Sequence, residues 1–291
     1  MYSAISKNKR NTVVIMVVFV ILIGLIGLVV GYLNDSYSLS VTILIMAAVY
    51  ALIQYFAAGS LAMAMTGAKE IQKNDAPELW RTVENLAITT GVPMPKVYLI
   101  NDPAPNAFAT GRDPKHAIVG ATTGLLKIMD KRELEAVMAH EMSHVQNYDI
   151  RVSMIAFGLV SAIGMLADVA LRMMFFGGDR DKNVHPLVYL LGIAVVILAP
   201  ILAAITQMAI SRQREYLADA SGALMTRDSE GLASALEKLR DHGKPMQKQS
   251  TSSANLFLSN PLEPGFFAKL FSSHPPLDER ISRLRNNATK M

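Results

Sequence analysis

Residues 140–144 read His-Glu-Met-Ser-His, and this stretch decides the fold of the chain more than any other. Residues four apart on a helix lie on one face, so His140 and His144 can both reach a single zinc ion. Glu141 then projects toward the position where a water would need a general base. An Asp-x-x-Glu capping box at 130–133 and apolar residues at helical spacing support a helix here. The stretch therefore predicts a metal site on a helix.

A zinc site of this kind needs a third protein ligand. A histidine six residues after His144 is excluded, because Ile150 stands there. The other common solution is a glutamate from a second helix, and residues 211–219 offer Glu215 and Asp219 on one helix face. Glu215 could bind the metal while Asp219 accepts a hydrogen bond from the far ring nitrogen of a ligand histidine. On spacing alone, an ordinary charged helix turn stays an open alternative.

The two motifs together resemble those of a known protein family. Residues 140–144, followed by Arg-Glu-Tyr-Leu-Ala-Asp at 214–219, resemble the HtpX family of membrane zinc metalloproteases, which are relatives of the CAAX prenyl endopeptidases. Two weaker blocks occur in the same order, Asn-Ala-Phe-Ala-Thr-Gly at 106–111 and Ser-His-Pro-Pro at 273–276, so the likeness covers nearly the whole chain.

This resemblance implies a set of roles. His140, His144 and Glu215 would bind one zinc ion, and Glu141 would be the catalytic base. It also implies cleavage of misfolded or damaged membrane proteins in quality control and the stress response.

The composition excludes an ordinary soluble enzyme. Of 291 residues, 51% are hydrophobic and the mean hydropathy is +0.29, which indicates a membrane protein. The net charge is +4, and the basic residues stand beside apolar segments, which favours the lipid bilayer over nucleic acid as a partner. With 0 cysteines, the metal must be held by nitrogen and oxygen ligands.

Four apolar segments predict four transmembrane helices: Thr12–Tyr32, Ser40–Met65, Val152–Phe176 and Leu187–Ile210. Basic residues precede the first segment and only an acidic residue lies in the first link, so the positive-inside rule places the N-terminus in the cytoplasm. The candidate ligands on the two motifs must lie on one side of the membrane to share an ion. The third and fourth segments therefore both span the membrane or neither does, and the length of the fourth favours both.

We therefore expect a mainly helical membrane protein with four transmembrane helices and a zincin-like α+β domain that carries a small β-sheet. Residues 1–66 would form a first transmembrane hairpin and 151–210 a second. Residues 67–150 and 211–291 would form the two cytoplasmic parts of the catalytic domain.

Three short strands are predicted at Lys96–Ile100, Ala107–Gly111 and Ala117–Ala121. An edge strand could pair with the backbone of an extended substrate through main-chain hydrogen bonds, which need no particular side chains. The candidate substrate-binding edge consists of Asn106, Ala107, Phe108, Ala109 and Thr110. A purely structural hairpin fits the strand pattern equally well.

His274 is a further catalytic candidate, because the rigid Pro275-Pro276 pair would hold its direction and such sites need a donor to the oxyanion. A loop histidine is the alternative. The favoured function is a zinc endopeptidase at the cytoplasmic face of the cell membrane, acting on membrane proteins or unfolded polypeptides. A metal-ion transporter should carry ligands within its spans, and the first, second and fourth segments contain no His, Asp or Glu. An inactive scaffold would be expected to lose Glu141.

Overall fold

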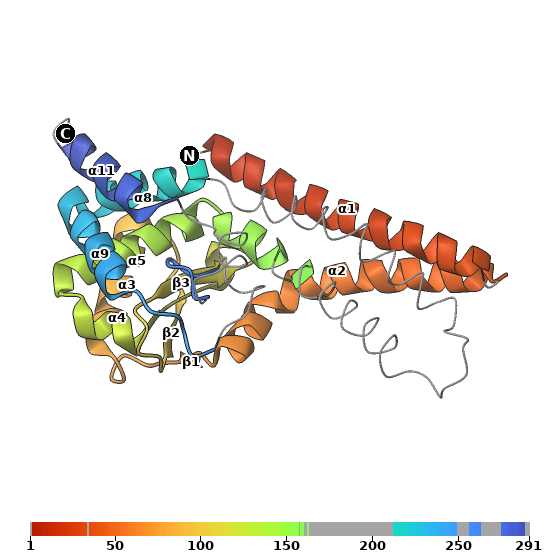
Figure 1. The fold of residues 1–291 in the computed structure, drawn as a ribbon, viewed down its shortest axis with the longest axis horizontal. Helices are drawn as coiled ribbons and strands as arrows, with labels where there is room; N and C mark the ends of the chain where they lie inside the picture. The colour runs from red at the N-terminus through yellow and green to blue at the C-terminus, as the bar shows by residue number, and fades with distance from the viewer. Residues whose placement is uncertain are drawn as a thin grey trace.

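The structure is a computed structural model that describes residues 2–33, 35–156, 158–159, 162, 212–248, 256–262 and 275–288. The predicted fourth transmembrane segment, most of the third and His274 lie outside the described residues. Figure 1 shows a long helical hairpin that projects from a globular part.

The hairpin consists of α1 (Tyr2–Leu33) and α2 (Tyr37–Thr66), which pack side by side near their connecting turn and diverge toward the globular part (Figure 1). Within the described part of the chain, these two helices are long and apolar enough to cross a membrane, with candidate spans at Ile5–Val29 and Tyr37–Ala57. Both helices expose many large hydrophobic side chains, as a lipid-facing surface requires. Close approach at the turn depends on Gly31, where an added Cβ would lie 1.8 Å from Ser40 Oγ.

The globular part contains a four-stranded sheet in the order β1-β2-β4-β3. Its strands are β1 (Lys69–Glu70), β2 (Lys96–Ile100), β3 (Ala107–Gly111) and β4 (Ala117–Thr122). The predicted β3–β4 hairpin is present, joined through the short 3-10 helix η1 (Pro114–His116). Strand β1 and the parallel pairing of β2 with β4 were not predicted. Strand β3 lies at one edge of the sheet, so the segment predicted to bind substrate is at an edge.

Six further helices lie with both ends inside the described residues: α3 (Pro77–Thr90), α4 (Thr123–Ile128), α5 (Lys131–Gln146), α8 (Arg212–Thr226), α9 (Ser229–His242) and α11 (Leu277–Ala288). Residues 149–156 are helical as well. Local signals set their ends. Pro77 opens α3, Gly91 ends it in the left-handed conformation with φ 67°, and the capping box predicted for α5 is formed.

Helix α5 is the centre of the globular part. It contacts α3, α8, α9 and β3, and most of its residues are buried (Figure 1). One hydrophobic core forms around it and includes Leu79, Val119 and Leu236. A second core lies between the sheet and the membrane hairpin and includes Phe19 and Phe108. The sheet is therefore covered on both sides, and the ends of the membrane helices pack directly against the globular part.

Candidate metal centre and active site

The site is built where α8 packs on α5. Gly222 of α8 faces the backbone of His140 on α5, and an added Cβ there would lie 3.0 Å from the His140 backbone nitrogen. The missing side chain lets the two helices approach closely. The hydroxyl of Ser143 donates to the carbonyl oxygen of Ala218 at 3.4 Å across the same contact. This packing brings the start of α8, with Glu215, over the two histidines.

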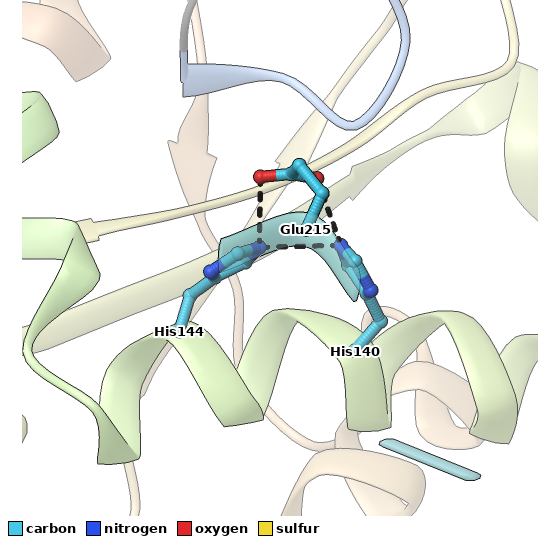
Figure 2. A group of neighbouring side chains, drawn as sticks. All are labelled: His140, His144 and Glu215. Atoms are coloured by element: carbon cyan, nitrogen blue, oxygen red, sulfur yellow. Dashed lines mark hydrogen bonds and ion pairs between the residues drawn. The ribbon is translucent and has the colours of Figure 1, made fainter. Parts of the chain in front are cut away.

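Figure 2 shows the three side chains that meet there. The Nε2 atoms of His140 and His144 are 3.2 Å apart. The carboxylate of Glu215 faces both rings, with Oε2 at 3.7 Å from His140 Nε2 and Oε1 at 3.8 Å from His144 Nε2. Taking one ligand atom from each residue, all three atoms lie within 4.8 Å of one another. The structure therefore brings together the three residues predicted as metal ligands.

These donors fit a divalent metal such as zinc. Two ligand atoms bonded to one tetrahedral zinc ion at about 2.0–2.1 Å lie about 3.4 Å apart, close to the observed separation of the histidine nitrogens. Two ring nitrogens and a buried carboxylate concentrate lone pairs in one place, which is unfavourable unless a cation or proton lies between them. In the part of the chain that the structure describes, no other group of three or more His and acidic side chains is close enough to share an ion.

His140 is oriented by a carboxylate that is itself held in place. Its Nδ1 lies 3.0 Å from Asp219 Oδ1, the contact predicted from the spacing of Glu215 and Asp219. The fully buried Arg280 of α11 donates two hydrogen bonds to the Asp219 carboxylate, from Nε at 3.0 Å and from Nη2 at 2.7 Å. Burial raises the pKa of Asp219, but the charge of Arg280 and the hydrogen bond from His140 outweigh it and hold that pKa well below its ordinary value. Asp219 is therefore an anion.

His144 has its own carboxylate partner, which the sequence reading missed. Its Nδ1 lies 3.0 Å from Asp149 Oδ2. The other oxygen of Asp149 accepts a hydrogen bond of 2.6 Å from the side-chain amide of Asn8, and the same amide donates to the carbonyl oxygen of Asn147 at 2.9 Å. Asn8 belongs to α1, so a membrane helix contributes to the surroundings of the site. Arg214 Nε lies 3.7 Å from Asp149 Oδ1.

The two histidines differ in their attraction for protons. Burial lowers the pKa of His140, and the positive charge of Arg280 lowers it further, so the value stays below normal despite Asp219. Burial also lowers the pKa of His144, but the hydrogen bond to Asp149 and the charges of Glu215, Asp149 and Glu141 outweigh this and raise it. His140 is therefore neutral at physiological pH. A metal that binds His144 must displace a proton.

Glu141 lies in a small cavity with two of the candidate ligands. The cavity has a volume of about 40 Å³ and is lined by Ala109, Glu141, His144 and Glu215, and by residues 256–258. Glu141 itself is 3% exposed. A space of this size and polarity holds water molecules but not a peptide.

The predicted substrate-binding edge is partly covered on its outer side. Phe108 forms an antiparallel bridge with Phe257, and the backbone nitrogen of Leu258 donates to the carbonyl oxygen of Ala107 at 2.9 Å. The side chain of Asn106 donates to the carbonyl of Ser259 at 2.8 Å and accepts from its backbone nitrogen at 2.9 Å. Ala109 lines the same cavity as Glu141, while Thr110 is fully buried. Substrate binding by these residues stays a prediction.

The apolar hairpin, the His-Glu-x-x-His helix and the glutamate of a second helix define the class of protein, a membrane metalloprotease. The profile of peptidase family M48 matches residues 73–288, and the chain belongs to this family. The family confirms the prediction of a metalloprotease.

Similar proteins agree with this assignment. The chain is 56% identical over 286 residues to the Protease HtpX homolog of Tropheryma whipplei (strain Twist), covering 98% of both chains. It is 44% identical over 294 residues to the Protease HtpX homolog of Ligilactobacillus salivarius (strain UCC118), covering 98% of this chain and 99% of the relative. These relatives confirm the resemblance to the HtpX family.

A solved structure shares the fold. The crystal structure of S. mikatae Ste24p matches with a TM-score of 0.51 at 17% identity, covering 98% of this chain and 66% of that chain. The chain thus spans about two thirds of the length of that protein.

Proposed function

We propose that this protein is a zinc-dependent endopeptidase whose metal is held by His140, His144 and Glu215. One observation carries the proposal: ligand atoms of these three residues, from two helices far apart in the sequence, lie within 4.8 Å of one another. Their chemistry, two imidazoles and one carboxylate, is that of a catalytic zinc site that keeps a further coordination position for water or substrate.

Zinc held there would supply a Lewis acid for the attacking water and the peptide carbonyl. Glu141 takes the proton of the attacking water and passes it to the leaving amine. Its place in the same cavity as His144 and Glu215 supports this role. Asp219 and Asp149 accept hydrogen bonds from the Nδ1 atoms of His140 and His144, which leaves each Nε2 unprotonated toward the metal.

The substrates we propose are extended stretches of unfolded or damaged membrane proteins. Pairing with edge strand β3 would recognise the backbone whatever its side chains. Because the present cavity is only about 40 Å³, residues 256–258 must move away from Ala109 before a peptide can reach the metal. The contact of Asn8 in α1 with Asp149 supports a site close to the membrane surface.

We place this site on the cytoplasmic side, as the charges around the first hairpin favour. In this proposal, residues 1–66 and 151–210 form two membrane hairpins, and 67–150 with 211–291 form the catalytic domain. A role in membrane-protein quality control and the stress response follows from the likeness to the HtpX family. His274 remains the proposed oxyanion donor.

The proposal is tested with Glu141→Gln, which keeps the shape of the side chain but cannot accept a proton. Cleavage of an unfolded protein such as casein should fall at least about 100-fold, because a general base contributes about 10²–10⁴-fold. Bound zinc should be unchanged. Glu135→Gln on the same helix removes the same charge and should leave both unchanged. Normal turnover by Glu141→Gln would reject the mechanism.

A further inference from the structure

A second cavity, of about 250 Å³, lies between α2 and the sheet. One wall is formed by Phe56, Gly59 and Ser60 of α2. The other is formed by Lys96 and Tyr98 of β2 and by residues 111–112 and 115–118 around η1. It shares no lining residue with the catalytic cavity. Because it opens beside the membrane hairpin, its depth relative to the bilayer decides what can occupy it.

The end of the candidate span in α2 indicates that the cavity lies near the depth of lipid headgroups. The candidate span of α2 ends at Ala57. With a rise of about 1.5 Å per residue, Gly59 and Ser60 lie about 3–5 Å beyond that end. The headgroup region is about 5–7 Å thick on each side of the hydrocarbon core. A phospholipid whose chains lie along α2 can therefore present its phosphate to the cavity.

The lining is suited to an anion. It includes the cations Lys96, Arg112 and Lys115, and within the described residues it contains no carboxylate. Lys96 pairs with Glu70 at 3.0 Å, and Arg112 lies 3.7 Å from Asp113, so these two cations are partly compensated. Lys115 is exposed and has no ion pair with any residue that the structure describes.

Aromatic side chains of α2 pair with cationic side chains near the cavity, where the hairpin meets the globular part. The guanidinium of Arg112 lies 5.3 Å from the ring centre of Phe56, and that of Arg151 lies 5.7 Å from Tyr55. Arg151 Nε also donates to the carbonyl oxygen of Arg112, which connects the two pairs. Such pairs are typical of the membrane–water interface, where aromatic rings and cations meet the headgroups. This favours a lipid over a free anion.

We propose that this cavity binds the phosphate of one anionic phospholipid, with Arg112 and Lys115 as its cationic contacts. Phe56 and Met94, which are 63% and 39% exposed, provide apolar contacts for the adjoining part of the lipid. Arg112 follows β3 directly, and Ala109 of that strand lines the catalytic cavity. The bound lipid therefore ties the candidate substrate-binding strand to the bilayer surface. The inference does not depend on the proposed metal ligands.

The experiment is native mass spectrometry of the full chain in non-ionic detergent, with Glu141→Gln present to prevent self-cleavage. Phosphatidylglycerol and phosphatidylcholine with identical acyl chains are added in parallel. One phosphatidylglycerol should be retained, at least about fivefold more tightly than phosphatidylcholine. Because each surface cation contributes about a fivefold preference for anionic lipid, Lys115→Gln should weaken binding about fivefold and Arg112→Gln with Lys115→Gln about 25-fold.

The matched control is Lys127→Gln with Lys131→Gln, which removes the same charge from exposed positions outside the cavity. Equal loss in this control would show general charge attraction and overturn the site, as would equal retention of the two lipids. Displacement by inorganic phosphate would make it a simple anion site, and displacement by an acidic peptide would assign it to a protein partner. Either result overturns the lipid assignment. Lys115→Gln changes an exposed side chain and should fold normally. This single variant therefore still tests the proposal if Arg112→Gln misfolds.

Discussion

At the scale of single residues, two buried carboxylates set the orientation of the metal-binding histidines. Asp219 accepts from His140 and is fixed by Arg280, whereas Asp149 accepts from His144 and is fixed by Asn8. An imidazole whose Nδ1 proton is engaged by an anion presents an unprotonated Nε2 to the metal and is a stronger ligand. Each histidine thus has a carboxylate partner, supplied from a different part of the chain.

Asp219→Asn should lower the affinity for zinc or the activity about 10–100-fold, because the amide carries no charge to support the His140 ring. Competition with a chelator of known affinity measures the change in zinc binding. Asp241→Asn, an exposed change of the same kind, is the control. Unchanged zinc affinity and turnover in Asp219→Asn would show that this contact has no part in metal binding.

Helical spacing and the ligand requirements of a metal site predicted the approach of Glu215 and Asp219 to the histidines, but the contacts of Arg280 and Asn8 were missed. His140 with His144 and Glu215 with Asp219 are each four residues apart, so helical geometry alone places each pair on one face. Asp149 stands only five residues after His144, and this closeness in the sequence could have suggested their contact. Arg280 is 61 residues from Asp219 and Asn8 is 141 residues from Asp149, and such tertiary contacts leave no periodic trace in a single sequence.

At the scale of elements, the N-terminal end of α5 is held by Glu133. Its carboxylate completes the capping box by accepting from the backbone nitrogen of Asp130 at 2.9 Å. It also accepts from Ser234 at 2.7 Å and from Lys238 at 2.6 Å, both on α9. One buried carboxylate therefore caps the helix that carries the candidate metal ligands and ties it to its neighbour.

This network predicts a pH-dependent stability. Burial raises the pKa of Glu133, but the hydrogen bonds from Lys238, Ser234 and the Asp130 backbone outweigh it and leave that pKa below 4.5. A lowered folded-state pKa stabilises the fold above the unfolded value, and this stabilisation is lost as the pH falls through the folded value. At neutral pH, Glu133→Gln should lower the free energy of unfolding by about 1.5–3 kcal/mol.

Thermal unfolding in detergent, followed from about pH 7 to about pH 3, measures the effect. The difference between wild type and Glu133→Gln should shrink only below pH 4.5. Glu135→Gln lies outside the network and should show no such pH dependence. A difference between wild type and Glu133→Gln that stays constant over the whole range would contradict an ionised Glu133.

Helix α1 acts both as a candidate membrane span and as a support for the metal site. Asn8→Ala removes the amide that holds Asp149, and the affinity for zinc should fall about tenfold, the lower end of the range for such supporting contacts. Thr12→Ala is the matched control. Thr12 is also a buried polar residue of α1, but its hydroxyl donates only within the helix, to the carbonyl oxygen of Asn8 at 3.0 Å. Equal loss of zinc in both variants would assign the effect to general packing of α1.

The elements themselves were mostly predictable, because their signals are local. Strands β2, β3 and β4 were all predicted with nearly the observed bounds. Strand β1 has two residues, which is too short for an alternating pattern. The parallel pairing of β2 with β4 depends on which strands meet in space, and no short-range signal specifies that.

At the scale of the whole molecule, the sheet separates two packed layers. One face packs on α5 and its neighbours, and the other contributes Ile100, Phe108 and Ile118 to a core shared with α1 and α2. The candidate metal site therefore lies in a globular part whose position relative to the membrane helices is fixed by packing. Overall hydropathy predicted the membrane helices, but it could not predict that they form one face of the core around the site.

The central claim is that α5 and α8 together hold one zinc ion through His140, His144 and Glu215. Zinc bound to purified Glu215→Ala, measured by elemental analysis after mild chelation, tests it most directly. Wild type should retain about one zinc ion per chain, and Asp278→Ala, which removes an exposed carboxylate of α11, should match it. Glu215→Ala should retain almost none, because only two protein ligands remain. Stoichiometric zinc in Glu215→Ala would contradict the shared site and require another third ligand.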